Sequence, residues 1–270
     1  GLCRTDLYVA RGELAASPGV ILGHDAPRIV RALSRPAAAR SLRFRAPVGI
    51  APRVPSGPCA GCQQAGCDAT PSPDRCLTPH QLGIDLDGVF AEFVALPACC
   101  LYPIDAEVSP LRAAYLEPVA AAMGALTAGL TAQDVGVVAG RGRIAELTAR
   151  VLEYAGLPRP RIVPTEAFDA AVPRGTLDFV IDAGLPTDGA LAAMTGALRK
   201  GGTLILKSRA AQARSFMPAD WVAREITVAA RSYGSFQDAA RAIADERLAL
   251  EDLFGAARPL SAFEHVFDDA

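Results

Sequence analysis

Two short segments near the start of the chain combine side chains that can bind a metal and move a proton. The first segment carries Cys3, Thr5 and Asp6, and the second carries His24 and Asp25. Thiolate, imidazole and carboxylate groups are the ligands that zinc accepts, and a catalytic zinc takes three of them and keeps a fourth position open. A single Cys or His is more often a core residue, but the combination indicates a metal site with catalytic chemistry.

A distant carboxylate completes this set. Glu117 is followed by Pro118, and we expect it as the third protein ligand beside Cys3 and His24. Proline is typical of the first helical positions, because its missing N–H costs nothing there. Glu117 would then precede a helix, where the helix dipole favours a carboxylate even without a metal. Both explanations of Glu117 stay open.

Four further cysteines form a separate cluster with the spacing C-x2-C-x4-C-x8-C, namely Cys59, Cys62, Cys67 and Cys76. The segment around them is rich in Gly, Pro, Asp and Gln, so it has little apolar material with which to build a core. Four thiolates around one zinc would supply that stability, and such sites are closed and structural. We expect a structural zinc here. The alternative is a loop whose metal site is degraded, which the insert Thr70-Pro71-Ser72-Pro73 favours.

A predicted strand, a glycine-rich turn and a predicted helix follow one another between residues 134 and 154. The turn reads Gly140-Arg141-Gly142-Arg143-Ile144-Ala145. Gly140 permits a tight turn, Gly142 lets the backbone approach a pyrophosphate, and Ala145 allows the helix to pack closely on the strand. The helix N-terminus offers N–H donors to phosphates. The order indicates a dinucleotide site, although an ordinary strand–helix turn would use the same glycines for geometry alone.

Strands expected at 161–163, 177–183, 203–206 and 225–231 alternate with helices, which predicts a parallel, doubly wound sheet. Helices are also expected at 111–114, 119–126 and 236–244, and half-buried strands such as 88–96 in the first 118 residues. One feature of dinucleotide-binding folds is missing. An acid usually ends the second strand and bonds the ribose, whereas Pro164 occupies that place and Glu166 comes slightly late. The choice between NAD and NADP is left open.

Composition excludes several classes of protein. The hydrophobic fraction of 51% and the charged fraction of 21% indicate a globular protein, and the formal net charge of −2 gives no reason to expect nucleic acid or an anionic membrane as partner. No membrane-length apolar run and no signal peptide are evident, so a cytoplasmic location is expected. Seven cysteines in such a chain favour metal or thiol chemistry over disulfides. The adjacent Cys99 and Cys100 would suit a thiol redox sensor or plain packing.

Taken in order, these blocks resemble the zinc-dependent medium-chain dehydrogenase/reductase family of alcohol, polyol and threonine dehydrogenases. That family reads Gly-x-Cys-x-Thr/Ser-Asp in its first block and Gly-His-Glu in its second, where this chain has Asp25 in place of the Glu. The resemblance implies an α/β protein with two domains. Residues 1–118 would form a GroES-like β-rich catalytic domain, shortened at both chain ends and joined by the tail 256–270. Residues 119–255 would form a Rossmann dinucleotide-binding domain.

The resemblance also implies an activity, the transfer of a hydride between a small alcohol, or its aldehyde or ketone, and NAD or NADP. Zinc would lower the pKa of the alcohol oxygen. Cys3, His24 and Glu117 would hold this metal. Asp25 would be a neighbour that approaches the metal when the ligand set changes, or simply a carboxylate that fixes nearby backbone. A homodimer is the expected assembly.

Further roles follow from the same resemblance. Thr5 would take the alcohol proton, Asp6 would orient His24, and Arg4 would face the cofactor pyrophosphate. Each has a plainer alternative, a turn cap for Thr5 and Asp6 and a solvated charge for Arg4. The family usually spaces its four zinc-binding cysteines C-x2-C-x2-C-x7-C, from which this chain departs. The alternative function is a non-catalytic, zinc-stabilised relative with lost or weak cofactor binding, which this departure and the missing ribose acid favour.

Overall fold

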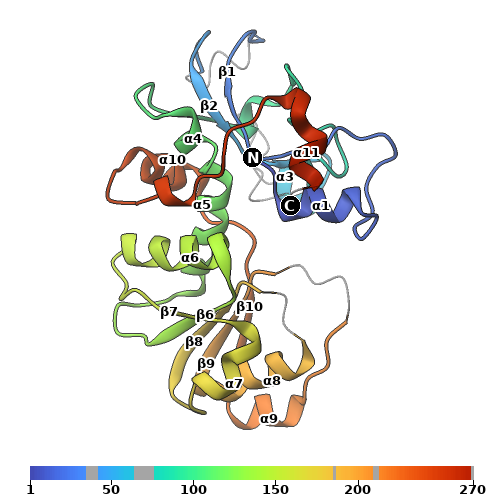
Figure 1. Ribbon diagram of the computed structural model, residues 1–270. Coiled ribbons are helices and arrows are strands. Elements are labelled where there is room, and N and C mark those ends of the chain that lie inside the picture. The colour runs from blue at the N-terminus through green and yellow to red at the C-terminus, as the bar shows by residue number, and fades with distance from the viewer. Residues whose placement is uncertain (35–41, 64–75, 185–186, 209–212, 269–270) are drawn as a thin grey trace. The chain divides into compact units, whose positions relative to one another are not determined.

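The structure is a computed structural model that describes residues 1–34, 42–63, 76–184, 187–208 and 213–268 (Figure 1). Packing divides the chain into two compact units. The first unit consists of residues 1–117, 236–244 and 254–270, and the second of residues 118–235 and 245–253. The α/β class predicted from the sequence is confirmed.

The second unit is built on a five-stranded parallel sheet with the strand order β10-β9-β8-β6-β7. Its strands are β6 (Gly136–Ala139), β7 (Arg161–Val163), β8 (Leu177–Asp182), β9 (Leu198–Leu206) and β10 (Thr227–Ala230). The helices that connect them are α6 (Gly142–Tyr154), α7 (Phe168–Ala171), α8 (Asp188–Ala197) and α9 (Pro218–Ala223). Strand and helix alternate as the sequence predicts.

Both faces of this sheet are covered, which makes it doubly wound (Figure 1). On one face Ala145, Ala149 and Leu152 of α6 pack against β6, β8 and β9. On the other face Phe168 of α7 and Met194 of α8 pack against the same strands and β7. Parallel sheets need this double cover because their strands are apolar on both sides. The small side chains of α6 let the helix lie close to the glycine-rich turn.

The first unit holds the β-rich part of the chain. Three antiparallel strands form one sheet in the order β1-β2-β5, and two short strands, β3 and β4, pair separately. Their bounds are β1 (Pro27–Ile29), β2 (Pro47–Ile50), β3 (Arg53–Val54), β4 (His80–Gln81) and β5 (Leu101–Pro103). The helices with residues in this unit are α1 (Arg4–Ala10), α3 (Ala60–Gln63), α4 (Pro110–Ala113), α5 (Leu116–Met123), α10 (Phe236–Ala244) and α11 (Phe263–Asp268). Ile50, Leu82 and Val89 lie in its main apolar core.

The strand expected at residues 88–96 is not formed. The backbone N–H groups of Gly88, Val89 and Phe90 instead donate to carbonyls of Ile21, Gly23 and Leu22, at 2.7, 2.9 and 3.0 Å. These bonds hold a turn against the loop that carries the second sequence block. The apolar side chains of this segment are not all buried, since Phe93 is 72% exposed, and tertiary hydrogen bonds determine the backbone conformation.

Helix α10 packs within the first unit, whereas the sequence assigns residues 236–244 to the second domain. The Phe236 ring stacks on Tyr102 with 5.4 Å between ring centroids. Arg112 Nε donates to the Ile243 carbonyl at 2.9 Å. Both contacts join segments more than a hundred residues apart, which no local pattern reports.

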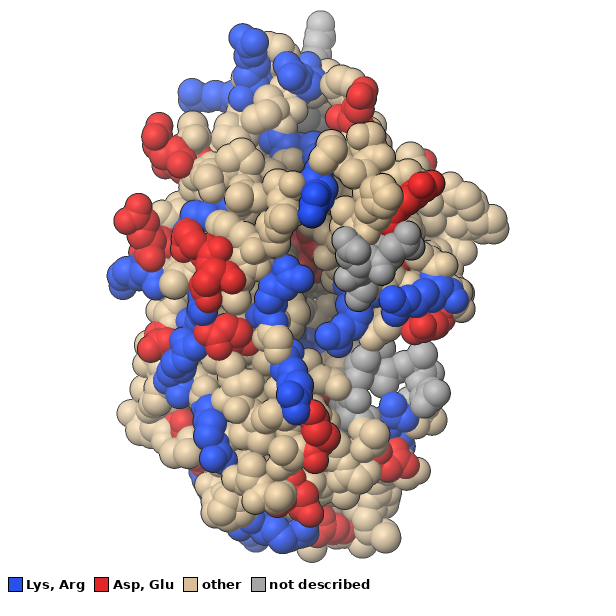
Figure 2. Space-filling model, viewed as in Figure 1, with Lys and Arg blue, Asp and Glu red and all other residues tan. Residues whose placement is uncertain are grey.

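Charges on the surface match the near-neutral balance of the chain. Basic and acidic side chains are interspersed over the face seen in Figure 2, so neither sign dominates it. Among the described residues, no helix combines the length and the apolar character needed to cross a membrane.

A buried carboxylate organises the edge of the parallel sheet where β8 and β9 end. Asp182, the last residue of β8, has no exposed surface. It accepts hydrogen bonds from the N–H groups of Gly184 and Ser208, at 3.0 and 3.3 Å, and from the Ser208 hydroxyl. The loops that follow two neighbouring strands are thus held to one side chain.

We predict that Asp182→Ala lowers the free energy of unfolding of the second unit by about 2–4 kcal/mol, because it leaves buried donors without an acceptor. Trp221 is the only tryptophan and lies in this unit, so its fluorescence in a urea titration reports the unfolding of that unit. Asp188→Ala, at an exposed position in the first turn of α8, is the control and should cost less than about 1 kcal/mol. Equal losses in both variants would contradict the role given to Asp182.

Candidate functional site

The Asp6 carboxylate joins the two sequence blocks that carry the candidate metal ligands. Asp6 lies in the first turn of α1 and is 1% exposed. One of its oxygens accepts the N–H of Cys3 at 2.8 Å, and the other accepts the N–H of Gly23 at 3.0 Å. A buried carboxylate needs such donors. These two bonds fix Cys3 and His24, the neighbour of Gly23, with respect to each other.

Gly23 is required by the path of the second block. Its φ of +93° lies in the left-handed region that favours glycine. A β-carbon at this position would also overlap the Phe90 ring. The backbone can therefore turn His24 inward only with glycine before it.

Cys3, His24 and Asp25 converge in the first unit. Each offers one ligand atom, and these atoms all lie within 4.8 Å of one another. His24 is 3% exposed and Asp25 is 5% exposed. The Thr5 hydroxyl lies next to this group, with its oxygen 3.8 Å from the Cys3 sulfur. Of the residues predicted for this site, these are the ones that the structure brings together most closely.

Glu117 lies beside this group without belonging to it. Its carboxyl hydrogen-bonds that of Asp25, and burial together with the charge of Glu117 holds the pKa of Asp25 well above its usual range. Burial lowers the pKa of His24, but the hydrogen bond with Cys3 and the charges of Glu117, Cys3 and Asp6 outweigh it and raise that pKa to about 9. Several acidic groups therefore lie close together around one imidazole, and the raised pKa values mean that Asp25 and His24 retain their protons.

The donor set fits a divalent metal ion. His24 Nδ1 and Asp25 Oδ1 are buried and have no hydrogen-bond partner among the described residues. A cation bound by thiolate, imidazole and carboxylate would take the place of the protons that these groups retain. Thiolate and imidazole ligands favour zinc over magnesium or calcium.

The expected hydrogen bond between Asp6 and His24 is not formed. Their nearest atoms, Asp6 Oδ1 and His24 Nδ1, are 3.7 Å apart, which is longer than a hydrogen bond. Both oxygens of Asp6 already accept backbone N–H groups. Asp6 thus positions His24 through the backbone of Gly23. Arg4 is exposed on α1.

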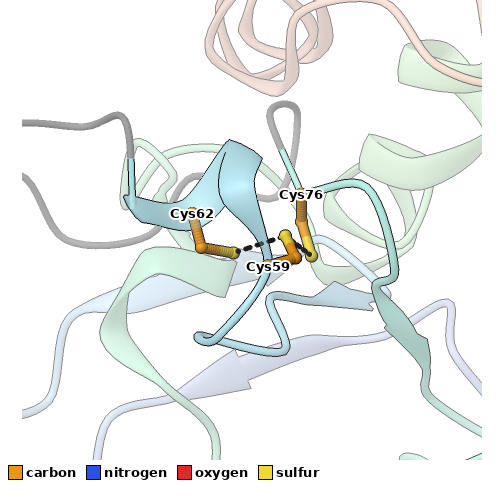
Figure 3. A group of neighbouring side chains, drawn as sticks. All are labelled: Cys59, Cys62 and Cys76. Atoms are coloured by element: carbon orange, nitrogen blue, oxygen red, sulfur yellow. Dashed lines mark hydrogen bonds between the residues drawn. The ribbon is translucent and has the colours of Figure 1, made fainter.

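The cysteine-rich segment forms a second group of thiols (Figure 3). The Cys59 sulfur lies 3.4 Å from that of Cys62 and 3.7 Å from that of Cys76. Four sulfur atoms around one zinc, each about 2.3 Å from it, would lie about 3.8 Å apart. Cys67, the fourth predicted ligand, lies outside the described residues.

Backbone N–H groups point at two of these sulfur atoms, as thiolates require. The Leu77 N–H donates to Cys59 at 3.3 Å, and this bond is the main cause that lowers the pKa of Cys59 to about 5. The Ser56 N–H donates to Cys76 at 3.3 Å. Burial opposes ionisation of Cys76, but the bonds from Ser56 outweigh it and lower its pKa. The arrangement fits a metal held by thiolates.

In the second unit, the glycine-rich turn connects β6 to α6. Gly140 has a φ of +155° and a β-carbon there would press on the Ala183 backbone, while Gly142, with a φ of +74°, faces open space. Ala145 is fully buried against the sheet. The turn therefore leaves room for a group at the helix N-terminus.

Two residues near this turn were not singled out from the sequence. Gly184 follows β8, and a β-carbon there would collide with the Thr165 hydroxyl and approach the Gly140 Cα to 3.1 Å. Thr165 Oγ1 is buried and has no hydrogen-bond partner among the described residues. The sequence signal for both was present, since Gly184 and Pro164-Thr165 directly follow predicted strands.

Known proteins share parts of this chain. Residues 1–106 match the alcohol dehydrogenase GroES-like domain. An L-threonine 3-dehydrogenase from Stenotrophomonas maltophilia is 26% identical over 160 residues, covering 57% of this chain and 44% of that protein. The starvation-sensing protein RspB of Escherichia coli is 30% identical over 156 residues, covering 57% and 43%. The matches therefore span less than half the length of these relatives.

Solved structures agree over nearly the whole chain. A structure described as a zinc-binding dehydrogenase from Sinorhizobium meliloti, bound to NADP, superposes with a TM-score of 0.86 at 22% identity, covering 100% of this chain and 86% of that one. The rspB protein from Escherichia coli, described as an alcohol dehydrogenase in complex with NADH, gives 0.81 at 18% identity, covering 99% and 84%. At these identities the likeness establishes the fold.

The GroES-like match, the dehydrogenase relatives and the shared fold agree with one another, and in each the chain resembles the medium-chain dehydrogenase/reductase family. The resemblance inferred from the sequence is thereby confirmed.

We predict that Cys76→Ala lowers the zinc content of the purified protein by one equivalent, because it removes one of the converging thiolates. Zinc bound after exhaustive dialysis would be measured by mass spectrometry. Cys99→Ala is the matched control, since Cys99 belongs to neither group of candidate metal ligands. This variant should keep the full zinc content. An unchanged zinc content in Cys76→Ala would favour the alternative, a loop whose metal site is degraded.

Proposed function

We propose that this protein is a zinc-dependent oxidoreductase that transfers a hydride between a small alcohol, or its aldehyde or ketone, and NAD or NADP. The observation that carries the proposal is the convergence of Cys3 with the buried His24 and Asp25 beside the carboxyl of Glu117, in a chain that resembles the medium-chain dehydrogenases. The glycine-rich turn of the second unit supports a dinucleotide as the second reactant. The two ligands thus have separate candidate sites in the chain.

Cys3 and His24 would hold the catalytic metal, with Asp25 or Glu117 as the third ligand. When bound, zinc polarises the substrate oxygen as a Lewis acid, and the nicotinamide exchanges the hydride. The mutual hydrogen bond of Asp25 and Glu117 supports either choice, because one carboxyl can approach a cation while the other retains the shared proton.

Thr5 would receive the proton of the substrate hydroxyl. In support, its hydroxyl lies beside the Cys3 sulfur and on the same helix as Asp6. A hydroxyl can both donate and accept, so it can pass a proton onward without holding a charge. Asp6 would keep Thr5 and the ligands in register through its backbone bonds.

Gly140, Gly142 and Ala145 would bind the cofactor pyrophosphate through the backbone at the start of α6. The open space at Gly142 supports this assignment. Arg4 near the pyrophosphate and a homodimeric assembly are predictions of the family resemblance and stay proposals.

Replacing Cys3 by Ala tests the metal chemistry. The value of kcat/KM for alcohol oxidation should fall by about a thousandfold or more, because the substrate oxygen loses its Lewis acid. NADH and NADPH binding, followed by nucleotide fluorescence, should persist in the variant. Full activity in Cys3→Ala would rule out the mechanism. A folded wild type that binds neither nucleotide would instead favour the non-catalytic relative.

Replacing Thr5 by Val tests the proton path. We expect kcat to fall by roughly a hundredfold or more, since general acid–base groups contribute on that scale. Thr5→Ser keeps the hydroxyl and should retain most of the activity, and zinc content should stay the same in both. If Thr5→Ser and Thr5→Val lower kcat by the same factor, Thr5 acts by packing and not by proton transfer.

A further inference from the structure

An ion pair links the glycine-rich turn to the end of the neighbouring strand. Arg141 lies between the two glycines of the turn as the N-cap of α6, and its guanidinium pairs with the carboxylate of Glu166. The side chains are 67% and 62% exposed. An ion pair in water contributes little to stability, so folding alone does not account for this contact.

The place of the pair in the sheet is specific. β6 and β7 are adjacent and parallel, with Ala139 opposite Val163, and Gly140 N–H donates to the Val163 carbonyl at 2.9 Å. Arg141 and Glu166 therefore follow two neighbouring strands at their carboxyl ends. In parallel sheets of this kind the pyrophosphate lies at the helix N-terminus, and the adenosine ribose lies at the end of the second strand.

The Thr165 hydroxyl gives this edge a further polar group. Its oxygen is buried next to Gly184 and lacks a partner among the described residues. Pro164, where an acid would ordinarily end the strand, has no side chain that can bind a ribose. Within the described part of this edge, Thr165, Glu166 and Arg141 are the groups that could contact the ribose.

Glu166 and Arg141 have opposite preferences for what the ribose carries. A carboxylate accepts hydrogen bonds from the 2′- and 3′-hydroxyls of NAD and repels the 2′-phosphate of NADP. A guanidinium binds that phosphate through two parallel hydrogen bonds. Its own backbone N–H and the Arg141 guanidinium both lower the pKa of Glu166, so the carboxylate stays ionised and the pair is neutral as a whole.

We propose that the Arg141–Glu166 pair determines the choice between NAD and NADP, with each partner restraining the preference of the other. The inference rests on the proposed function and names the two residues that select its cofactor. The wild type then binds both nucleotides with similar affinity. Without Glu166 the protein would prefer NADP, and without Arg141 it would prefer NAD. No buried acid is then needed at the end of β7.

The test is a set of fluorescence titrations of the full chain with NADH and with NADPH, read as the ratio of the two dissociation constants. In Glu166→Gln the ratio should move about tenfold toward NADPH, and in Arg141→Gln about tenfold toward NADH, as expected for the loss of one charge-assisted contact. Both substitutions are at exposed positions, and the folded state would be checked by thermal melting.

Arg143→Gln is the matched control. Arg143 is exposed in the same turn and forms no ion pair with a described residue. Its loss should weaken both nucleotides about equally, because the pyrophosphate is common to them. Ratios that stay fixed in Glu166→Gln and Arg141→Gln, or that move as far in Arg143→Gln, would overturn the inference while leaving the proposed function intact. A wild type that binds neither nucleotide would overturn both.

Discussion

The candidate metal site depends on one buried carboxylate. Asp6 accepts the N–H of Cys3 and the N–H of Gly23, and these two bonds bridge segments that are seventeen residues apart in the chain. Burying an unpaired carboxylate would be costly, and each missing donor would weaken the arrangement further. The same two bonds that stabilise Asp6 therefore determine where the thiol and the imidazole lie.

This dependence explains why the site lies on irregular backbone. Cys3 precedes a short helix and His24 lies in a loop, so neither is held by a strand ladder. Gly23 supplies the backbone angle, Asp6 supplies the anchor, and Phe90 closes the space above the glycine. A cation would be the last component, because Asp25 and Glu117 bring two carboxyl groups together beside a single imidazole. Backbone hydrogen bonds thus prepare the ligands, and the charge of the ion would complete the site.

The sequence predicted the second unit more completely than the first. Helix α6 and strands β6 to β10 follow from local patterns, since a buried parallel strand is an apolar run and its helix has a 3.6-residue period. The first unit has strands of two to four residues, and burial there follows long-range contacts. Residues 88–96 therefore alternate like a strand without forming one.

The residue types of the candidate metal ligands could also be predicted from the sequence, but the distances between these residues could not. Whether Asp25 or Glu117 lies nearer to Cys3 depends on the packing of α5, and Asp6 was expected to contact the His24 ring where it contacts the backbone beside it.

The end of β7 shows how an edge strand changes the chemistry available to a parallel sheet. Among the described residues, no strand pairs with its outer side. It is only three residues long, begins with a charged residue and is followed by Pro164, all features that discourage pairing with another strand. A carboxylate at the end of a covered strand would be shielded from water, so it could bind a ribose strongly without a second charged group. At an open edge the surroundings are aqueous and single charges are screened. Recognition of a ribose in such a place is better achieved by two opposed charges in contact, because their mutual bond holds both side chains in position before any ligand arrives.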